Sequence, residues 1–196
     1  MKARINSLIA FTSIAMFAAG CASAPSKFYT LNSTAQDDGK KRVDYAITVG
    51  PVSIPMEVDR PEFTVRISSN RVAIDEFNRW AEPLNSNIAR VVAGDLATLL
   101  GTPRVISVPM ANFAPDYRVT IDIQRFESAP GKSAQLEAVW VVRKSNGGQA
   151  VSGRTIAIEP VTDDSFNALA AAHSRALAKV SSDIAAAIRA EANKKQ

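Results

Sequence analysis

Near its middle the chain carries the stretch Tyr117-Arg118-Val119-Thr120-Ile121-Asp122-Ile123-Gln124, and this stretch decides the fold. Apolar residues at every second position alternate with polar ones. Because successive side chains of a strand point to opposite faces, the stretch predicts a strand with one face in a core and the other in water. A sheet covered by helices on both sides would show continuous apolar runs instead. The pattern therefore predicts a sheet with helices on one face.

The chain that follows repeats this alternation. Apolar residues again take every second position from Leu136 to Val142. Asn146-Gly147-Gly148 is typical of a hairpin turn, and residues 151–160 are expected to return as the next strand. Consecutive strands joined by a tight turn are antiparallel, so this half of the sheet is predicted to be antiparallel.

Shorter strands are predicted upstream. Phe28–Leu31 is expected to dock the N-terminal segment onto the domain, and the polar run that follows is expected to form a surface loop. Ala46–Pro55 contains two prolines, which remove ladder donors, so this strand should lie near an edge or carry a bulge. Alternation in residues 63–77 around Ser69-Asn70 predicts a hairpin with one buried face, and Arg104–Val108 predicts another short strand.

Two long helices complete the predicted fold. Apolar residues recur at helical spacing over Pro83–Leu100, where proline suits the first turn. A second stripe is predicted to run to about Ala192 from a cap at Asp163 or Asp164. This helix is rich in alanine, which is compatible with packing against a neighbouring subunit and equally with plain helix propensity.

These elements predict an α/β fold of the α+β kind. It has two layers, with a mixed, mainly antiparallel sheet packed against two long helices. Removal of residues 1–20 would leave 176 residues, which is the size of one ordinary domain.

The N-terminus has the layout of a secretory signal peptide. Lys2 and Arg4 precede the mostly apolar run Ile5–Ala19, and Ala18-Ala19-Gly20 places small side chains before Cys21. The apolar run is shorter than the roughly 20 residues that span a bilayer. Small residues before a cysteine suit a lipoprotein signal peptidase, and the thiol can then take a diacylglycerol.

Cys21 is therefore predicted to be the lipidated N-terminus of the mature protein. Leucine is usual at the position of Ala18, so the fit is not ideal, and an ordinary signal peptide or a buried cysteine remain the alternatives. Ala22 stands where aspartate would favour the inner membrane, so the expected location is the periplasmic face of the outer membrane. The expected covalent groups are diacylglycerol and an N-acyl chain such as palmitate, and no other cofactor or metal is expected.

The predicted division is a signal peptide over residues 1–20, a lipidated tether over 21–27, a single domain over 28–192 and a tail over 193–196. Loss of Lys2 and Arg4 would leave 21 basic residues against 19 acidic ones. A nucleic-acid partner would need a clustered basic face, and the basic runs here are short and separated. No nucleic-acid role is predicted.

Catalysis is not predicted either. The chain has one histidine, His173, which lies on the apolar stripe of the last helix and is expected to be a core or interface residue. Gly131-Lys132-Ser133 begins a serine hydrolase elbow, but Gln135 takes the place of its last glycine. The sequence therefore favours a protein that works by binding.

Two polar segments are candidate contact sites. Asp59 and Arg60 lie between strands, where they would form either a turn with a local ion pair or a partner contact. Arg79 and Trp80 lie before the first helix. Trp80 would be a hydrophobic lid over the helix start or, with Arg79, an anchor for a partner, since both residue types are enriched at binding hot spots.

Several of these blocks carry a family resemblance. They are Phe28-Tyr29-Thr30-Leu31, Val49-Gly50-Pro51-Val52 leading to Asp59-Arg60-Pro61, Phe77-Asn78-Arg79-Trp80-Ala81-Glu82-Pro83-Leu84, and Tyr117–Glu127 ending in Arg125-Phe126-Glu127. Together, in this order, they resemble the ABC-type transport auxiliary lipoproteins, the PqiC/YmbA-like family. The resemblance implies an α/β lipoprotein of the outer membrane without catalytic residues. It also implies association with a transport system that contains mammalian-cell-entry (MCE) domain proteins, which is implicated in phospholipid movement and envelope integrity.

The expected function is thus non-enzymatic docking of a periplasmic MCE lipid conduit to the outer membrane, with the protein as a homo-oligomer. Direct carriage of an acyl chain or phospholipid by the domain is the first alternative. An envelope hydrolase that uses Ser133 or His173 is the second.

Overall fold

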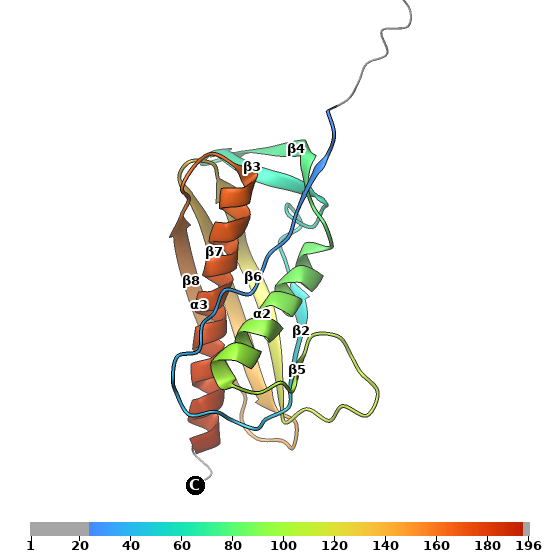
Figure 1. Cartoon of the computed structure of the whole chain (residues 1–196), viewed down its shortest axis with the longest axis vertical. Helices are drawn as coiled ribbons and strands as arrows, with labels where there is room; N and C mark the ends of the chain where they lie inside the picture. Colours follow the sequence, from blue (N-terminus) through green and yellow to red (C-terminus); the bar gives the residue numbers. More distant parts are fainter. Residues whose placement is uncertain (1–23, 194–196) are drawn as a thin grey trace, which may run out of the picture.

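The computed structural model describes residues 24–193, which form one mixed α/β unit of two sheets and two helices (Figure 1). The elements in chain order are β1 (Lys27–Tyr29), β2 (Ile47–Ser53), β3 (Glu62–Ser68), β4 (Arg71–Trp80), α2 (Leu84–Leu100), β5 (Val105–Ile106), β6 (Tyr117–Ala129), β7 (Ser133–Lys144), β8 (Val151–Pro160) and α3 (Phe166–Asn193). The predicted signal peptide and Cys21 lie outside the described residues. Within residues 24–193 no helix is long and apolar enough to cross a membrane.

The larger sheet has the strand order β5-β2-β6-β7-β8. Strands β6, β7 and β8 are antiparallel, and β2 runs parallel to β6 and β5. The alternation predicted for β6 is confirmed, because Tyr117, Val119, Ile121 and Ile123 are buried whereas Arg118, Asp122 and Gln124 are exposed.

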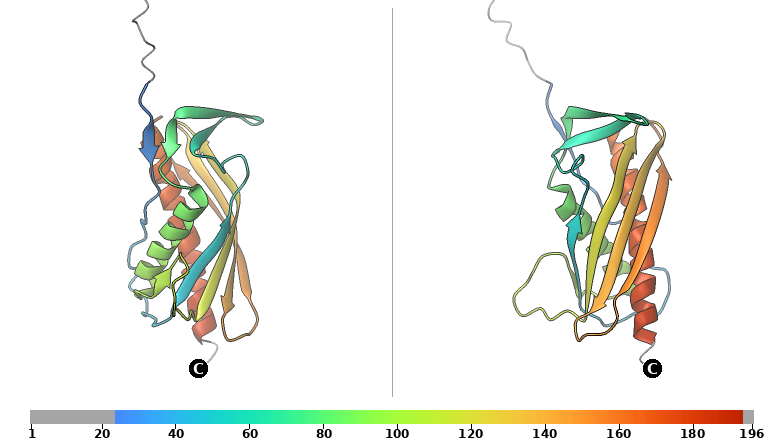
Figure 2. Two further views of the ribbon diagram at one scale, coloured as in Figure 1. Left: turned by 90° about the vertical axis from the view of Figure 1, so that its right-hand side faces the viewer. Right: turned by 180° about the vertical axis from the view of Figure 1, so that it is seen from behind.

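Both helices lie on the same face of this sheet, with α2 against β2 and α3 against β7 and β8 (Figure 2). The predicted two-layer arrangement is confirmed.

Strand β2 behaves as its prolines predict. It lies next to β5, a two-residue edge strand, and its register with β6 shifts between Val49 and Val52. The shift falls where Pro51 cannot donate a ladder hydrogen bond.

A second, three-stranded sheet has the order β1-β4-β3. The β3–β4 hairpin was expected to have one buried face. This prediction is confirmed only in the first half of β3. Phe63 and Val65 are buried, but Ile67, Val72, Ile74 and Phe77 are 39–47% exposed. The hairpin extends across one end of the molecule, where the larger sheet and the helices no longer cover it (Figure 2).

Helix α2 follows Pro83 and ends at Gly101, whose φ of 65° is left-handed, as is usual for a glycine after a helix. The cap predicted for α3 is wrong in detail. The side chain of Ser165 caps the helix, because its Oγ accepts a hydrogen bond from the Ala168 N–H at 3.1 Å. Asp163 instead accepts from the Ser165 N–H at 2.7 Å and so supports the capping residue.

Five of the eleven alanines of α3 face the interior. Ala168, Ala170, Ala172, Ala176 and Ala185 are buried within this one chain. Their small side chains let α3 pack closely on its neighbours in the same molecule. The other six alanines are exposed or half-buried, so packing within the chain explains only part of the alanine content.

Candidate docking site

The sequence-predicted contact residues gather at the start of α2. Asp59, Arg60 and Trp80 line a groove of about 380 Å³ whose other walls are Pro61, Ala81, Glu82, Pro83 and Leu84. The loop between β2 and β3 forms one side, and the end of β4 with the first turn of α2 forms the other. Two segments about twenty residues apart in the sequence therefore build one surface feature.

Trp80 forms the apolar part of this groove and is held from behind. Its side chain is only 5% exposed, and its ring stacks on Phe63 with 4.0 Å between centroids. The main-chain N–H of Trp80 donates to the carbonyl of Pro61 at 2.7 Å, and this bond joins the two sides of the groove. Trp80 is therefore the hydrophobic lid over the start of α2. Only the small exposed part of its side chain that lines the groove is accessible to a partner.

Asp59 and Arg60 are the charged groups on the other wall. The expected ion pair between them is not formed, and the turn is instead stabilised by main-chain hydrogen bonds from Val58 to Pro55 and from Asp59 to Met56. In the described part of the chain neither side chain has a partner, and both are exposed. They are available to an external polar group.

Arg79 is not part of the groove. It is adjacent to Trp80 on β4, so its side chain points to the opposite face of the strand. There its Nη2 contacts Glu62 Oε1 at 2.8 Å. The structure thus brings together three of the four predicted contact residues and uses the fourth to pair β3 with β4.

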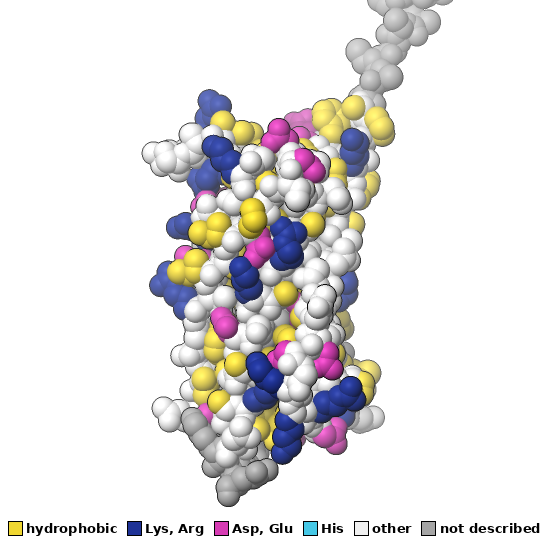
Figure 3. Space-filling model, turned by 60° about the vertical axis from the view of Figure 1, so that its left-hand side comes forward, with side chains coloured by type: hydrophobic (Ala, Val, Ile, Leu, Met, Phe, Trp, Pro, Cys, Tyr) yellow, Lys and Arg dark blue, Asp and Glu magenta, His cyan; other side chains and the backbone are white. Residues whose placement is uncertain are grey.

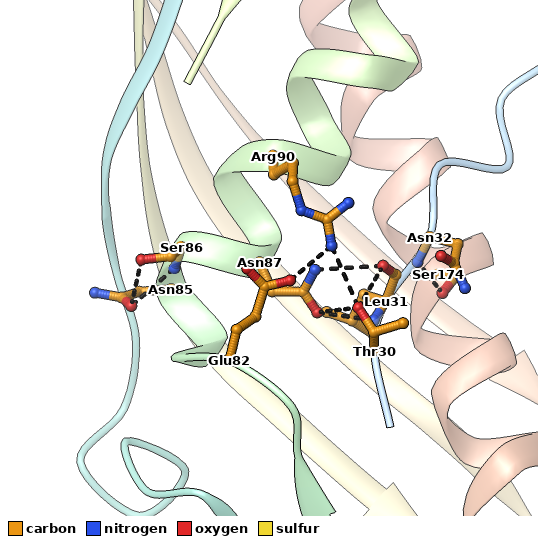
Figure 4. A network of polar contacts seen from close by, with 9 residues as sticks. All are labelled: Thr30, Leu31, Asn32, Glu82, Asn85, Ser86, Asn87, Arg90 and Ser174. Atoms are coloured by element: carbon orange, nitrogen blue, oxygen red, sulfur yellow. Dashed lines mark hydrogen bonds and ion pairs between the residues drawn. The ribbon is translucent and has the colours of Figure 1, made fainter. Parts of the chain in front are cut away.

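The N-terminal segment is fastened beside this groove (Figure 4). β1 pairs in parallel with β4, and the buried Leu31 follows it. Asn87 of α2 accepts from the Leu31 N–H at 2.7 Å and donates to the Leu31 carbonyl at 3.3 Å, as a neighbouring strand would. Ser174 of α3 accepts from the Asn32 N–H at 3.1 Å.

A buried carboxylate extends this attachment. Asp95 of α2 is fully buried, and its Oδ1 accepts hydrogen bonds from Ser33 Oγ and from the main-chain N–H groups of Thr34 and Ala35 at 2.6–3.0 Å. Its Oδ2 accepts from Ser181 of α3 at 3.0 Å. The loop predicted for this run is on the surface, but its first residues are bonded to both helices.

Sequence reasoning missed Asn87 and Asp95. One sequence feature could have indicated them. Each is a polar residue beside the apolar stripe of the helix, because Asn87 precedes Ile88 and Asp95 precedes Leu96. Such a residue is buried only when hydrogen-bonded, which predicts a partner but not its identity.

His173 is a core residue, as expected. It is fully buried, its ring stacks on Phe126 at 3.7 Å, and its Nε2 lies 2.9 Å from Ser128 Oγ. Burial lowers the pKa of its imidazole to about 3. The serine beside it is Ser128, not Ser133, and it is buried as well. Residues 24–193 also contain no cluster of three or more side chains suited to a metal ion.

Comparison with known proteins identifies the family. The profile of the ABC-type transport auxiliary lipoprotein component family matches residues 29–185. The chain belongs to this family. The resemblance drawn from the sequence blocks is thereby confirmed, and with it a transport-associated lipoprotein class.

Solved structures share the fold. Protein XCC0632 from Xanthomonas campestris, a DUF330 protein, is 20% identical and superposes with a TM-score of 0.70 over 87% of this chain and 100% of its own. An uncharacterized protein is 17% identical, with a TM-score of 0.69 over 84% of this chain and 99% of its own. At these identities the likeness concerns the fold alone. No curated protein matches the sequence.

Proposed function

We propose that this family member is a non-enzymatic outer-membrane lipoprotein that docks the periplasmic end of an MCE-type lipid conduit, as a homo-oligomer, and so supports envelope integrity. Family membership supports an auxiliary transport role. The observation that carries the docking role is the groove with two unpartnered charges, Asp59 and Arg60, beside an apolar edge of Trp80. Interfaces commonly combine an aromatic anchor with polar groups at its rim.

The position of the groove also fits this role. It adjoins β4, to which β1 is paired, and β1 begins six residues after Cys21. A conduit that delivers lipid to the outer membrane has to end close to that membrane. The groove lies toward the end of the domain that the proposed lipid anchor would keep close to the outer membrane.

Site-specific crosslinking tests the docking role. A photoreactive residue at the exposed Arg60 should give an adduct in cells that contain the MCE protein and none in cells that lack it. Arg143, also exposed, lies near the far end of β7 and is the matched control position. Equal adducts at both positions, or none at Arg60, would contradict docking through the groove.

Direct lipid carriage remains the second candidate because of one further feature. A largely apolar groove of about 500 Å³ lies between α2 and the segment after β5, lined by Ala93, Gly94, Ala97, Val105, Val108 and Met110 among others. Mass spectrometry of lipid extracted from a Cys21→Ala protein tests it, because this variant cannot carry the covalent lipid. Stoichiometric phospholipid would favour carriage over docking.

A further inference from the structure

Exposed apolar side chains gather on the three-stranded sheet. They are Phe28, Val72, Ile74 and Phe77, which are 39–65% exposed. We call this group the hairpin surface. Single exposed apolar residues are ordinary on proteins. Several of them on one short hairpin and the strand beside it, at an end where Figure 3 shows hydrophobic side chains among charged ones, favour a surface that another apolar phase covers.

The strand register places the central members on the outer face. Phe63 pairs with Asp75 and packs into the core, whereas Ile74 pairs with Thr64 one position further along. Because neighbouring residues of a strand face opposite ways, Ile74 and Val72 point away from the core. Phe28 precedes the core-facing Tyr29 and so points outward too.

The N-terminal segment leaves the domain at this same end. Figures 1 and 2 show β3 and β4 at the end from which that segment departs, with the C-terminus at the opposite end. Lys27 of β1 is six residue steps after Cys21. An extended chain spans at most about 3.6 Å per residue, so a lipid anchor at Cys21 would keep the bilayer surface within about 20 Å of β1.

The charges near the hairpin surface are balanced. Residues 62–80 contain three arginines and three acidic residues. Arg79 is paired with Glu62, and Arg66 is paired with Glu127 of β6 at 2.8 Å. A surface of this kind has no strong preference for anionic groups, and its attraction to a partner is mainly apolar.

We infer that the hairpin surface rests in the interfacial layer of the phospholipid membrane as a second contact beside the lipid anchor. This inference rests on the anchoring at Cys21 in the proposed function. An anchor alone leaves the domain free to rotate about its tether. The second contact sets one orientation, with the C-terminal end directed away from the membrane and the groove beside Trp80 held next to it.

Fluorescence quenching by brominated phospholipid tests the inference. The lipidated full-length protein is reconstituted in phosphatidylcholine vesicles with brominated acyl chains, and tryptophan is introduced by Ile74→Trp or, as a control, by Ile156→Trp. Both isoleucines are exposed strand residues, and Ile156 lies on β8 of the larger sheet. The native Trp80 and Trp140 are buried and supply a background that the parent protein measures.

The expected result is several-fold stronger quenching at position 74 than at position 156, unchanged by high salt. Equal quenching at the two positions would overturn the inference. The other possible occupant is a second copy of this chain. Crosslinking between copies through an Ile74→Cys thiol, with no quenching of Ile74→Trp, would assign the hairpin surface to that interface and overturn the membrane contact.

The test is independent of the docking proposal. If Arg60 still crosslinks to the MCE protein while position 74 is not quenched, only the membrane contact fails. If position 74 is quenched and Arg60 gives no adduct, docking through the groove fails and the membrane contact stands.

Discussion

At the residue scale, the packing of Trp140 depends on the absence of a side chain opposite it. Gly153 pairs with Trp140 across β7 and β8, and a Cβ built on this glycine would lie 2.2 Å from the indole ring. The indole is also fixed by its Nε1–H, which donates to Thr155 Oγ1 at 3.1 Å. The ring cannot move aside without losing this bond.

Gly153→Ala should therefore destabilise the protein. Overpacking of a fitted core typically costs about 1–3 kcal/mol, and we expect a loss of this size in the free energy of unfolding. Urea denaturation followed by circular dichroism measures it. Ser152→Ala, at the exposed neighbouring position, is the control and should change stability by less than about 0.5 kcal/mol. Equal effects of the two substitutions would contradict the packing role of Gly153.

The single histidine permits a direct measurement at the same scale. Because burial lowers the pKa of His173 to about 3, its imidazole should stay neutral from pH 8 down to about pH 5. In the unfolded chain the same group takes up a proton near pH 6.5. Between these two pH values only the unfolded chain takes up the proton. The free energy of unfolding should therefore be unaffected by His173 above about pH 6.5 and should decrease as the pH falls toward 3.

NMR chemical shifts of the imidazole test this prediction without a substitution, because no other histidine contributes a signal. We expect flat titration curves in the folded protein and a midpoint near 6.5 in urea. A midpoint between pH 6 and 7 in the folded protein would mean that His173 is open to solvent.

At the scale of elements, the residues after the tether are attached to both helices through Asp95. This attachment would fix the body of the domain relative to the proposed lipid anchor. The carboxylate accepts four hydrogen bonds, from Ser33, Thr34, Ala35 and Ser181. An amide in its place would turn an NH₂ group toward donors and leave buried groups unpaired.

Asp95→Asn should therefore loosen the N-terminal segment. We expect a loss of about 1–3 kcal/mol in stability and faster hydrogen exchange at the amides of Thr34 and Ala35. Asp37→Asn is the matched control, because Asp37 is exposed and accepts only from the Gly39 N–H. Unchanged exchange in the Asp95 variant would show that β1, Leu31 and the bonds to Ser174 hold the segment without Asp95.

At the scale of the whole molecule, the proposed anchor and the domain have separate tasks. Cys21→Ala should leave the folded domain unchanged, because the described fold begins after this residue. It should move the protein from the membrane to the soluble fraction, since each buried methylene of an acyl chain contributes about 0.8 kcal/mol. Cell fractionation and thermal melting measure the two effects, with Ser23→Ala as the control. A variant that still supports envelope integrity in full would show that the anchor is incidental.

Much of this architecture was predictable from residue patterns. The period of two from Tyr117 to Gln124 predicted the solvent-facing sheet, and the stripe over Pro83–Leu100 predicted α2, because both patterns are local. The groove was predicted in part, since Asp59, Arg60 and Trp80 were identified as contact candidates. Their meeting was not predictable, because it depends on a main-chain bond from Trp80 to Pro61 across the hairpin.

The sequence by itself determined the strands, the two amphipathic helices and the single face of the sheet that they cover. Each of these depends on neighbouring residues or on a period within one element. Only the tertiary structure decided that β3 and β4 leave the main sheet, that the end of this hairpin stays uncovered, and that Asn87 and Asp95 hold the segment after the tether. Those outcomes depend on contacts such as that between Leu31 and Asn87, which are 56 residues apart, and a local pattern carries no information about such a distance.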